Sequence, residues 1–532
     1  MRLVPINSSQ YEISFLQQFI ITVLVMLLFT IIRMLYKKFN KVKTPWPKVP
    51  NSNVFGAKIG TKNYADQFEE WARQYGEKGI YETKILGQTF YVVCNEDIAS
   101  QIERKRPYVV TRRKNLVSAF NSLGAQGLFS AEGQTWKKDR RLVAPSLNHK
   151  NVRDYISKIE LVAERLVTKW DGLINKNPVS GVPINDDILL ATVDIIALVA
   201  FAKDLDTVTM GGGKITTVLD KLFGLGMLRT MVPIKYFKIP IIGQYLDGGK
   251  KLIDFAFNFC GDIVNDFRRE NIDYDVKSKT FLGKMIELSD KDSANALSTE
   301  RFIGNLLTLF GAGSETSASA AMICLYEICV DKTGLQDKLY KEIMAMDARA
   351  TPSLESYLDS LPLLRSLLFE VLRMKGPTPV AGAENIAPIE VDGVMLPQNT
   401  YFLFLYKYIT EVEEFDKSTG KGTPRGLRNA PINQFCPYRW LEEKKESGKV
   451  VFRKPTYATG FRAFGAGVRI CPGSALAEIE VMIFVVFLLK RFEIHIAPDH
   501  PEVKLVSNLA QKPDRDIRII MKKRSEYKSN VQ

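Results

Sequence analysis

Histidine is scarce in this chain: His149, His495 and His500 are the only three among 532 residues. None of them has metal-ligand spacing with another histidine or with a cysteine, so the sequence does not support a histidine-built zinc or di-iron site. The six cysteines are widely scattered. This scatter argues against a disulfide framework and fits a reducing compartment.

Nucleotide-binding glycine motifs are also missing. Residues 210–215 lack the first glycine of a P-loop and the Ser or Thr that follows its lysine. Residues 311–313 and 465–467 lack the third glycine of a dinucleotide-binding turn. The chain therefore shows no flavin or nicotinamide domain of its own, and its electrons are expected to come from another protein.

Basic residues outnumber acidic ones, with 73 Lys and Arg against 59 Asp and Glu and a net charge of +14. Such a balance suits nucleic acid, acidic lipid or an acidic protein partner. We find neither zinc-finger spacing nor an isolated basic tail, so we predict no nucleic-acid partner.

One long apolar run, residues 13–32, carries no charged residue. At about 1.5 Å per residue, a helix over this run would span the roughly 30 Å hydrocarbon core of a bilayer. Five basic residues follow within residues 33–43, which by the positive-inside rule places the remaining chain in the cytosol. We predict a membrane anchor with a basic flank over residues 1–43; a cleaved signal peptide or a buried helix are the alternatives.

The proline-rich segment 44–50 predicts a stiff hinge, and residues 51–532 then form the catalytic domain. Helical periodicity dominates residues 134–345, including a long helix from Thr299 to Thr333 that Ser298 caps. Strand patterns occupy residues 80–85, 89–93, 385–406 and 490–522, with a hairpin signal at Asp392-Gly393. The predicted fold class is mainly α with small β-sheets.

The segment from Phe464 to Gly473 places Cys471 in a glycine-rich loop that leads into a helical pattern from Ser474. Glycines let backbone N–H groups approach the sulfur, and a helix N-terminus stabilises a thiolate. Phe464 would shield the sulfur from water, and Arg469 is placed to pair with a heme propionate. These are the requirements of a thiolate ligand to heme iron.

The same segment matches F-x-x-G-x-R-x-C-x-G, so the chain resembles the cytochrome P-450 family of heme-thiolate monooxygenases. For the motif alone, the alternative is a buried free cysteine in a turn. The resemblance covers nearly the whole chain from about residue 45. It implies a cytochrome P-450-like fold preceded by an N-terminal transmembrane helix, and heme b (iron protoporphyrin IX) bound by Phe464, Arg469, Cys471 and Gly473, with Cys471 as the metal ligand.

Two further motifs fit this resemblance. Trp136 and Arg140 form W-x-x-x-R on one helix face, and in the family both residues contact a heme propionate. Residues 312–316 match A-G-x-E-T, so Ala312 and Gly313 are expected to make room for dioxygen over the heme. Glu315 and Thr316 follow directly; alone, such motifs also fit ordinary helix faces.

In the family, the residues that match Glu315 and Thr316 relay protons to dioxygen and drive O–O cleavage. They are therefore the predicted catalytic residues. Glu370 and Arg373 form E-x-x-R, an i, i+3 ion pair. The resemblance extends their structural role to Arg439, which lies in the family's meander segment.

The chain departs from the family pattern at two positions. Gly376 stands where a proline is common, and Ala383 stands where an arginine or histidine usually binds a propionate. One propionate contact therefore lacks its expected partner.

The resemblance implies insertion of one oxygen atom of O2 into a small lipophilic substrate: a fatty acid, sterol, terpenoid or xenobiotic. The implied partners are an NADPH-dependent flavoprotein reductase and the endoplasmic reticulum membrane, with the catalytic domain cytosolic. The alternatives are a heme-thiolate isomerase or dehydratase acting on peroxides, and a non-enzymatic heme electron carrier. Expected substrate-pocket segments are residues 108–128, 302–312 and 377–383. The expected basic docking residues for the reductase are Lys137, Lys138, Arg141, Lys454 and Arg462.

Overall fold

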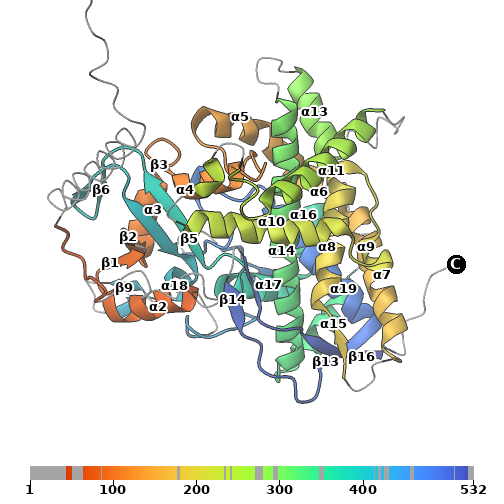
Figure 1. The fold of residues 1–532 in the computed structure, drawn as a ribbon. Coiled ribbons are helices and arrows are strands. Elements are labelled where there is room, and N and C mark those ends of the chain that lie inside the picture. Colours follow the sequence, from red (N-terminus) through yellow and green to blue (C-terminus); the bar gives the residue numbers. More distant parts are fainter. Residues whose placement is uncertain are drawn as a thin grey trace, which may run out of the picture.

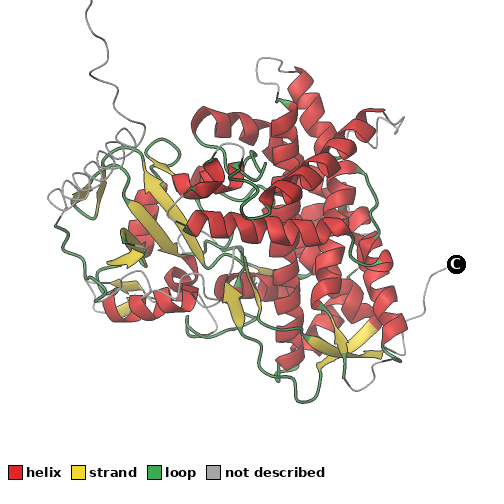
Figure 2. Ribbon diagram, in the orientation of Figure 1, coloured by secondary structure: helices red, strands yellow, loops and turns green. Residues whose placement is uncertain are grey.

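The computed structural model describes most of the chain from residue 43 onward. The described ranges are 43–50, 64–85, 87–176, 180–232, 235–239, 242–269, 279–291, 297–346, 353–411, 414–416, 421–423, 430–455, 460–507 and 510–524. A helical part holds most of the molecule, and a smaller β-rich part lies to its side (Figures 1 and 2). The prediction of a mainly α fold with small sheets is confirmed.

The helices follow one another through the whole described chain. They are α2 (Tyr64–Tyr75), α3 (Glu96–Glu103), α4 (Lys114–Asn121), α5 (Gly133–Val143), α6 (His149–Arg153), α7 (Ile156–Leu173), α8 (Asn185–Phe201), α9 (Thr207–Met210), α10 (Lys214–Met231), α11 (Gly249–Arg269), α13 (Phe281–Lys291), α14 (Thr299–Val330), α15 (Leu335–Ala345), α16 (Leu354–Asp359), α17 (Pro362–Lys375), α18 (Tyr406–Glu411) and α19 (Ser474–Arg491).

The strands are short and form several small sheets. They are β1 (Ile80–Ile85), β2 (Gln88–Val93), β3 (Val110–Thr111), β4 (Val182–Pro183), β5 (Val380–Asn385), β6 (Ile389–Val391), β7 (Val394–Leu396), β8 (Tyr401–Leu405), β9 (Glu414–Asp416), β10 (Lys421–Thr423), β11 (Leu441–Glu443), β12 (Val450–Phe452), β13 (Phe492–Ile496), β14 (Leu505–Ser507), β15 (Gln511–Pro513) and β16 (Arg518–Lys523).

The largest sheet has five strands in the order β1-β2-β8-β5-β3, in which β2 and β8 are parallel. The β6–β7 hairpin turns at Asp392 and Gly393, whose φ angles of 48° and 73° suit a tight two-residue hairpin turn. This confirms the hairpin predicted from the Asp-Gly pair. Near the C-terminus, β13, β16 and β4 form a second sheet.

Helix α14 runs through the middle of the helical part (Figure 1). It starts where predicted, because the Ser298 side chain accepts the backbone N–H of Arg301. It ends at Val330, three residues before the predicted Thr333. The reason is that Asp331 leaves the helical conformation and its carboxylate accepts the N–H groups of Thr333 and Leu335, at the start of α15.

The predicted hinge packs against the β-rich part. The Trp46 side chain is buried against Tyr91, with ring centroids 5.4 Å apart. Backbone N–H groups of Glu82 and Val49 join residues 47–49 to β1. The predicted anchor over residues 13–32 lies outside the described residues, and among the described helices none is long and apolar enough to cross a membrane.

Candidate heme-thiolate site

The loop that carries Cys471 is held by backbone hydrogen bonds between β12 and α19. The Cys471 N–H donates to the Phe464 carbonyl at 2.8 Å, and the Gly465 N–H donates to the Arg462 carbonyl at 2.8 Å. Gly465 and Gly467 have φ angles of 74° and 61°, which a side chain would strain. Cys471 keeps accessible surface although protein atoms surround its thiol.

Arg112 and Arg140 lie close enough to this thiol for their charges to act on it, and Arg106 and Arg469 belong to the same arginine cluster. The charges of Arg106, Arg112 and Arg140 all act on Arg469. Burial, aided by these like charges, lowers the pKa of Arg469 to about 9, and burial lowers the pKa of Arg112 to about 10. Burial raises the pKa of the Cys471 thiol, whereas the Gly473 N–H, Arg140 and Arg112 lower it.

Arg140 and Arg469 also hold the loop directly. Arg140 Nη1 donates to the Ile470 carbonyl at 2.8 Å. Arg469 Nη1 donates to the Ala131 carbonyl at 3.0 Å, and its guanidinium lies 4.2 Å from the ring centroid of Trp136. The structure therefore joins the W-x-x-x-R helix α5 to the cysteine loop.

This cluster fits a heme. Glu132 acts on both Arg112 and Arg469 and forms an ion pair with Arg469, whereas the cluster holds four guanidinium groups. Buried atoms of two of them, Nε and Nη2 of Arg106 and Nη1 of Arg112, have no hydrogen-bond partner. Such buried donors require anions, and the two propionates of a heme supply them.

Arg106 and Arg112 were not predicted as heme residues. The expected arginine or histidine near Ala383 is absent, and Ala383 is fully buried in β5. Strand β3 pairs with β5 and ends at Thr111, next to Arg112. The basic run at residues 104–113 was the available signal, because an uncompensated cluster of arginines in a strand-like segment requires anionic partners.

In α14, Ala312 and Thr316 share one helix face. Ala312 is exposed although it lies in the middle of a largely buried helix, and Thr316 is partly exposed. The Thr316 hydroxyl donates to the Ala312 carbonyl at 2.5 Å, a bond that competes with the helix ladder. Burial raises the pKa of Glu315, and Lys512 partly offsets this rise.

Gly313 packs closely against helix α8. A Cβ at this position would lie 2.6 Å from the Ile196 side chain on α8, so Gly313 allows α8 and α14 to approach. At Gly311, a Cβ would collide with the Phe223 ring of α10. Gly313 therefore serves the packing of α8 on α14, and its role in making room for dioxygen stays a prediction.

Glu370, Arg373 and Arg439 form one buried cluster. Glu370 accepts two bonds from Arg373, at 2.8 and 2.9 Å, and one from Arg439 at 2.9 Å. Both arginines also bond carbonyls of the segment around residue 432: Arg373 reaches Ile432, and Arg439 reaches the carbonyls of residues 430, 431 and 434. The cluster thus fixes α17 to the chain that leads into the cysteine loop.

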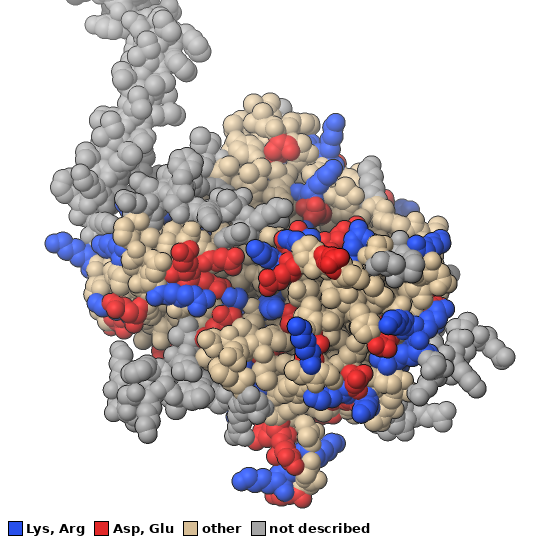
Figure 3. All heavy atoms as spheres, turned by 90° about the horizontal axis from the view of Figure 1, so that it is seen from below, with Lys and Arg blue, Asp and Glu red and all other residues tan. Residues whose placement is uncertain are grey.

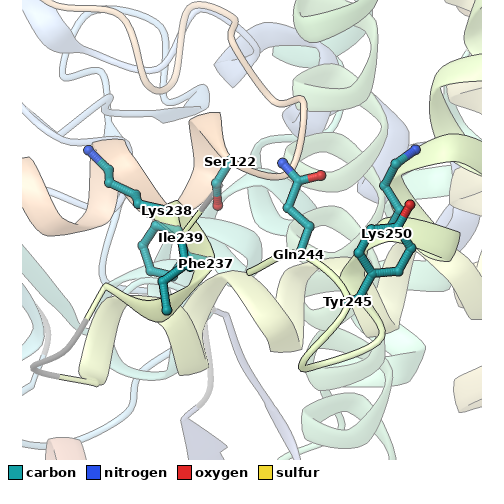
Figure 4. Close-up of a pocket in the computed structure, with 7 residues that line it drawn as sticks. All are labelled: Ser122, Phe237, Lys238, Ile239, Gln244, Tyr245 and Lys250. Carbon is teal, nitrogen blue, oxygen red and sulfur yellow. The ribbon is translucent and has the colours of Figure 1, made fainter. Parts of the chain in front are cut away.

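A small apolar pocket connects α4, α10 and α14. It is lined by Phe120, Leu123, Ala125, Leu219, Leu222, Phe223 and Leu307. The expected segments 108–128 and 302–312 both contribute, whereas the contribution of α10 was not predicted. Next to Leu123, Ser122 borders a surface cleft of about 680 Å³ (Figure 4). The cleft is also lined by Phe237, Lys238, Ile239, Gln244, Tyr245 and Lys250.

Comparison with known proteins agrees with this geometry. A family model described as Cytochrome P450 matches residues 42–518. Rabbit sterol 26-hydroxylase, a mitochondrial protein, is 26% identical over 413 residues, which cover 74% of this chain and 71% of the rabbit protein. Cytochrome P450 714A2 of Arabidopsis thaliana is 20% identical over 488 residues, which cover 87% of this chain and 88% of the Arabidopsis protein.

The fold is also similar to a solved structure. The crystal structure of the cytochrome P450DA heme domain aligns with a TM-score of 0.72 and 18% sequence identity. The alignment covers 91% of this chain and 99% of that domain.

Proposed function

From the premise that this chain belongs to the cytochrome P450 family of heme-thiolate monooxygenases, we propose that it inserts one oxygen atom of O2 into a small lipophilic substrate. One observation carries the assignment of the site: Arg106, Arg112, Arg140 and Arg469 form a cluster beside the Cys471 loop, and buried donor atoms of Arg106 and Arg112 have no hydrogen-bond partner. The test is reconstitution with heme and an NADPH-dependent flavoprotein reductase, followed by screening of fatty acids, sterols, terpenoids and xenobiotics for substrate-induced Soret shifts and oxygenated products. A chain that binds heme but shows no such shift or product contradicts the proposal.

Cys471 would be the iron ligand, and Arg106, Arg112, Arg140 and Arg469 would hold the propionates. When bound, heme supplies the activation of O2 and the transfer of oxygen to carbon. The arginines orient the group through charge-assisted hydrogen bonds and compensate its negative charge.

The proton supply comes from α14. Burial raises the pKa of Glu315, which favours the protonated carboxyl group that a proton donor needs. The Thr316 hydroxyl can leave the Ala312 carbonyl and donate into the space that Ala312 borders. Glu315 would then replace the proton that Thr316 gives up.

Thr316→Ala should keep heme and substrate binding but lose coupling. Loss of the hydroxyl misdirects protons, so product formed per NADPH should fall by about one to two orders of magnitude, with hydrogen peroxide released instead. Measuring NADPH, product and peroxide together checks this. Thr316→Ser keeps the hydroxyl and is the matched control; an unchanged ratio in Thr316→Ala would remove Thr316 from the relay.

The substrate class is supported by the apolar pocket. Its lining side chains are hydrophobic, and Phe223 reaches Gly311 of α14, one residue before Ala312. The surface cleft of Figure 4 and this pocket are lined by the neighbouring residues Ser122 and Leu123, so the cleft is the side from which we propose that a lipophilic molecule enters. The sequence leaves the individual substrate open.

The reductase proposal needs a basic surface near the cysteine loop. Lys138 is partly exposed, Arg141 and Lys454 are exposed, and Asp139 is buried against Arg301 and does not weaken that surface. Lys137 lies over the Tyr108 ring at 4.8 Å. Arg462 is 1% exposed, so its prediction as a docking residue was wrong. On the face seen from below, basic and acidic side chains are interspersed (Figure 3).

Lys138→Glu combined with Arg141→Glu should slow first electron transfer from the reductase several-fold at low salt. Opposite charges steer an acidic flavin domain to its site, and salt screens that attraction over about 10 Å at 0.1 M. In stopped-flow measurements, increasing salt should lower the rate of first electron transfer to the wild type more than to the variant. Equal salt dependence in the two proteins would exclude this surface, and the double variant Lys504→Glu, Lys522→Glu at two exposed lysines serves as a control with the same net charge.

The location at the endoplasmic reticulum membrane is also a proposal. It rests on the uncharged run 13–32 and the basic residues after it. Exposed apolar side chains at Ile239, Ile242, Tyr245 and Leu246 could add peripheral contact with lipid.

Removal of residues 1–43 should release the chain from carbonate-resistant membrane attachment and leave the heme spectrum unchanged, since Cys471 and the arginines around it lie outside the anchor. Fractionation and the visible spectrum of the truncated chain check both parts. If the truncated chain stays in the membrane fraction after carbonate extraction, the prediction that residues 1–43 form the anchor is wrong.

A further inference from the structure

Arg462 is a charged residue inside the protein, nine positions before the cysteine ligand. Its side chain crosses to α3. Nη2 donates to Glu96 Oε1 at 2.7 Å, Nη1 binds the other oxygen of Glu96, and Nε donates to Glu103 Oε2 at 2.9 Å. Nη2 also lies 3.0 Å from the Ser100 hydroxyl. Residues 96, 100 and 103 share one face of α3, so this face is built to receive a single guanidinium.

The backbone of Arg462 belongs to the cysteine loop. Its carbonyl accepts the Gly465 N–H, and the Phe464 carbonyl in turn accepts the Cys471 N–H. At the other end, Arg140 holds the Ile470 carbonyl. The loop is therefore fixed by one arginine at its start and by another near its end.

Helix α3 also leads into the chain that carries Arg106 and Arg112. Tyr406 donates to Glu103 at 2.7 Å, and the charges of Arg106 and Arg462 both act on Tyr406. The charge of Arg112 acts on Cys471. One helix thus supports both the thiolate loop and the guanidiniums expected to hold the propionates.

We propose that Arg462 is a positioning residue that locks the Cys471 loop to α3, so that the thiolate and the propionate-binding arginines keep a fixed spacing. This rests on the proposed role of Cys471 as heme ligand. The expected consequence is resistance of the thiolate-ligated heme to conversion into a form without thiolate ligation. A merely structural ion pair would affect unfolding without a separate effect on ligation.

The test follows the ferrous carbon-monoxide spectrum during mild heating, with far-UV circular dichroism recorded in parallel. Arg462→Lys keeps the charge but loses the fork that binds Glu96 and Glu103 together. We expect its thiolate band to convert at least several-fold faster than in the wild type, at temperatures where helix content is unchanged. We also expect the reduction potential of its bound heme to be higher than in the wild type. Arg229→Lys is the matched control, because Arg229 is equally buried and bound in a bidentate pair to Asp247, away from the loop.

The triple variant Arg462→Met, Glu96→Gln, Glu103→Gln removes the clamp without leaving a buried unpaired charge. We expect this variant to fold. Its ferrous carbon-monoxide spectrum should show the band of heme without thiolate ligation before any heating. The proposal would be overturned if the Arg462→Lys variant and the triple variant both fold and their thiolate bands convert at the wild-type rate, with the reduction potential of the wild-type heme. If Cys471→Ala also kept the thiolate band, the ligand assignment itself would fail, which separates the two claims.

Discussion

Cys471→Ala is expected to abolish the thiolate–carbon monoxide Soret band and to reduce monooxygenase turnover to background. The Cys471 sulfur would be the iron ligand that distinguishes this heme from one bound by histidine, and alanine would offer the iron no donor. The fold should survive, because the loop is held by its backbone bonds and by Arg140, and these contacts do not involve the sulfur. The absorption spectrum of the reduced protein under carbon monoxide measures the effect.

The matched control is Cys436→Ala. Cys436 is also a free, partly exposed cysteine, and its N–H donates to Glu370, a bond that the substitution keeps. This variant should retain the thiolate band at wild-type intensity. A thiolate band that persists in Cys471→Ala and disappears in Cys436→Ala would reassign the ligand.

Most molecules of the Glu370→Ala variant should fail to fold and to retain heme. Glu370 is fully buried, and its removal leaves the guanidiniums of Arg373 and Arg439 without their carboxylate. Breaking such a buried pair costs about 3–5 kcal/mol. Since whole proteins are stable by about 5–15 kcal/mol, the loss is a large fraction of the total. Heme content per protein and the denaturation midpoint report the effect.

Lys523→Ala is the control for this prediction. Lys523 pairs with Asp171 at 2.8 Å, but both side chains are partly or largely exposed to solvent. An exposed pair contributes about 0–1 kcal/mol, so the midpoint should hardly move. A similar fall in the denaturation midpoint of both variants would show that the Glu370 cluster contributes no more to stability than an exposed ion pair.

The cysteine loop and the E-x-x-R pair could be predicted because each is defined by local spacing. Phe464 to Gly473 is a contiguous segment, and Glu370 and Arg373 are neighbours on one helix face. Resemblance added Arg439, which the structure places against Glu370 at 2.9 Å. Local patterns of this kind survive folding unchanged.

The remaining parts of the site depend on distant contacts. Arg112 and Cys471 act on each other although 359 residues separate them, and no spacing in the sequence connects the two segments. Arg462 looks like a surface charge until Glu103, 359 residues away along the chain, is brought to it. The contact of Gly313 with Ile196 depends on the packing of α8 on α14, which no local pattern in the sequence indicates.

The ferrous carbon-monoxide difference spectrum of the purified wild-type chain tests the central claim most directly. It asks whether this protein binds heme through a cysteine thiolate, independently of substrate, reductase and membrane. The structure predicts the thiolate type of Soret band at about one heme per chain. A spectrum of the histidine-ligated type at full heme occupancy would contradict the account.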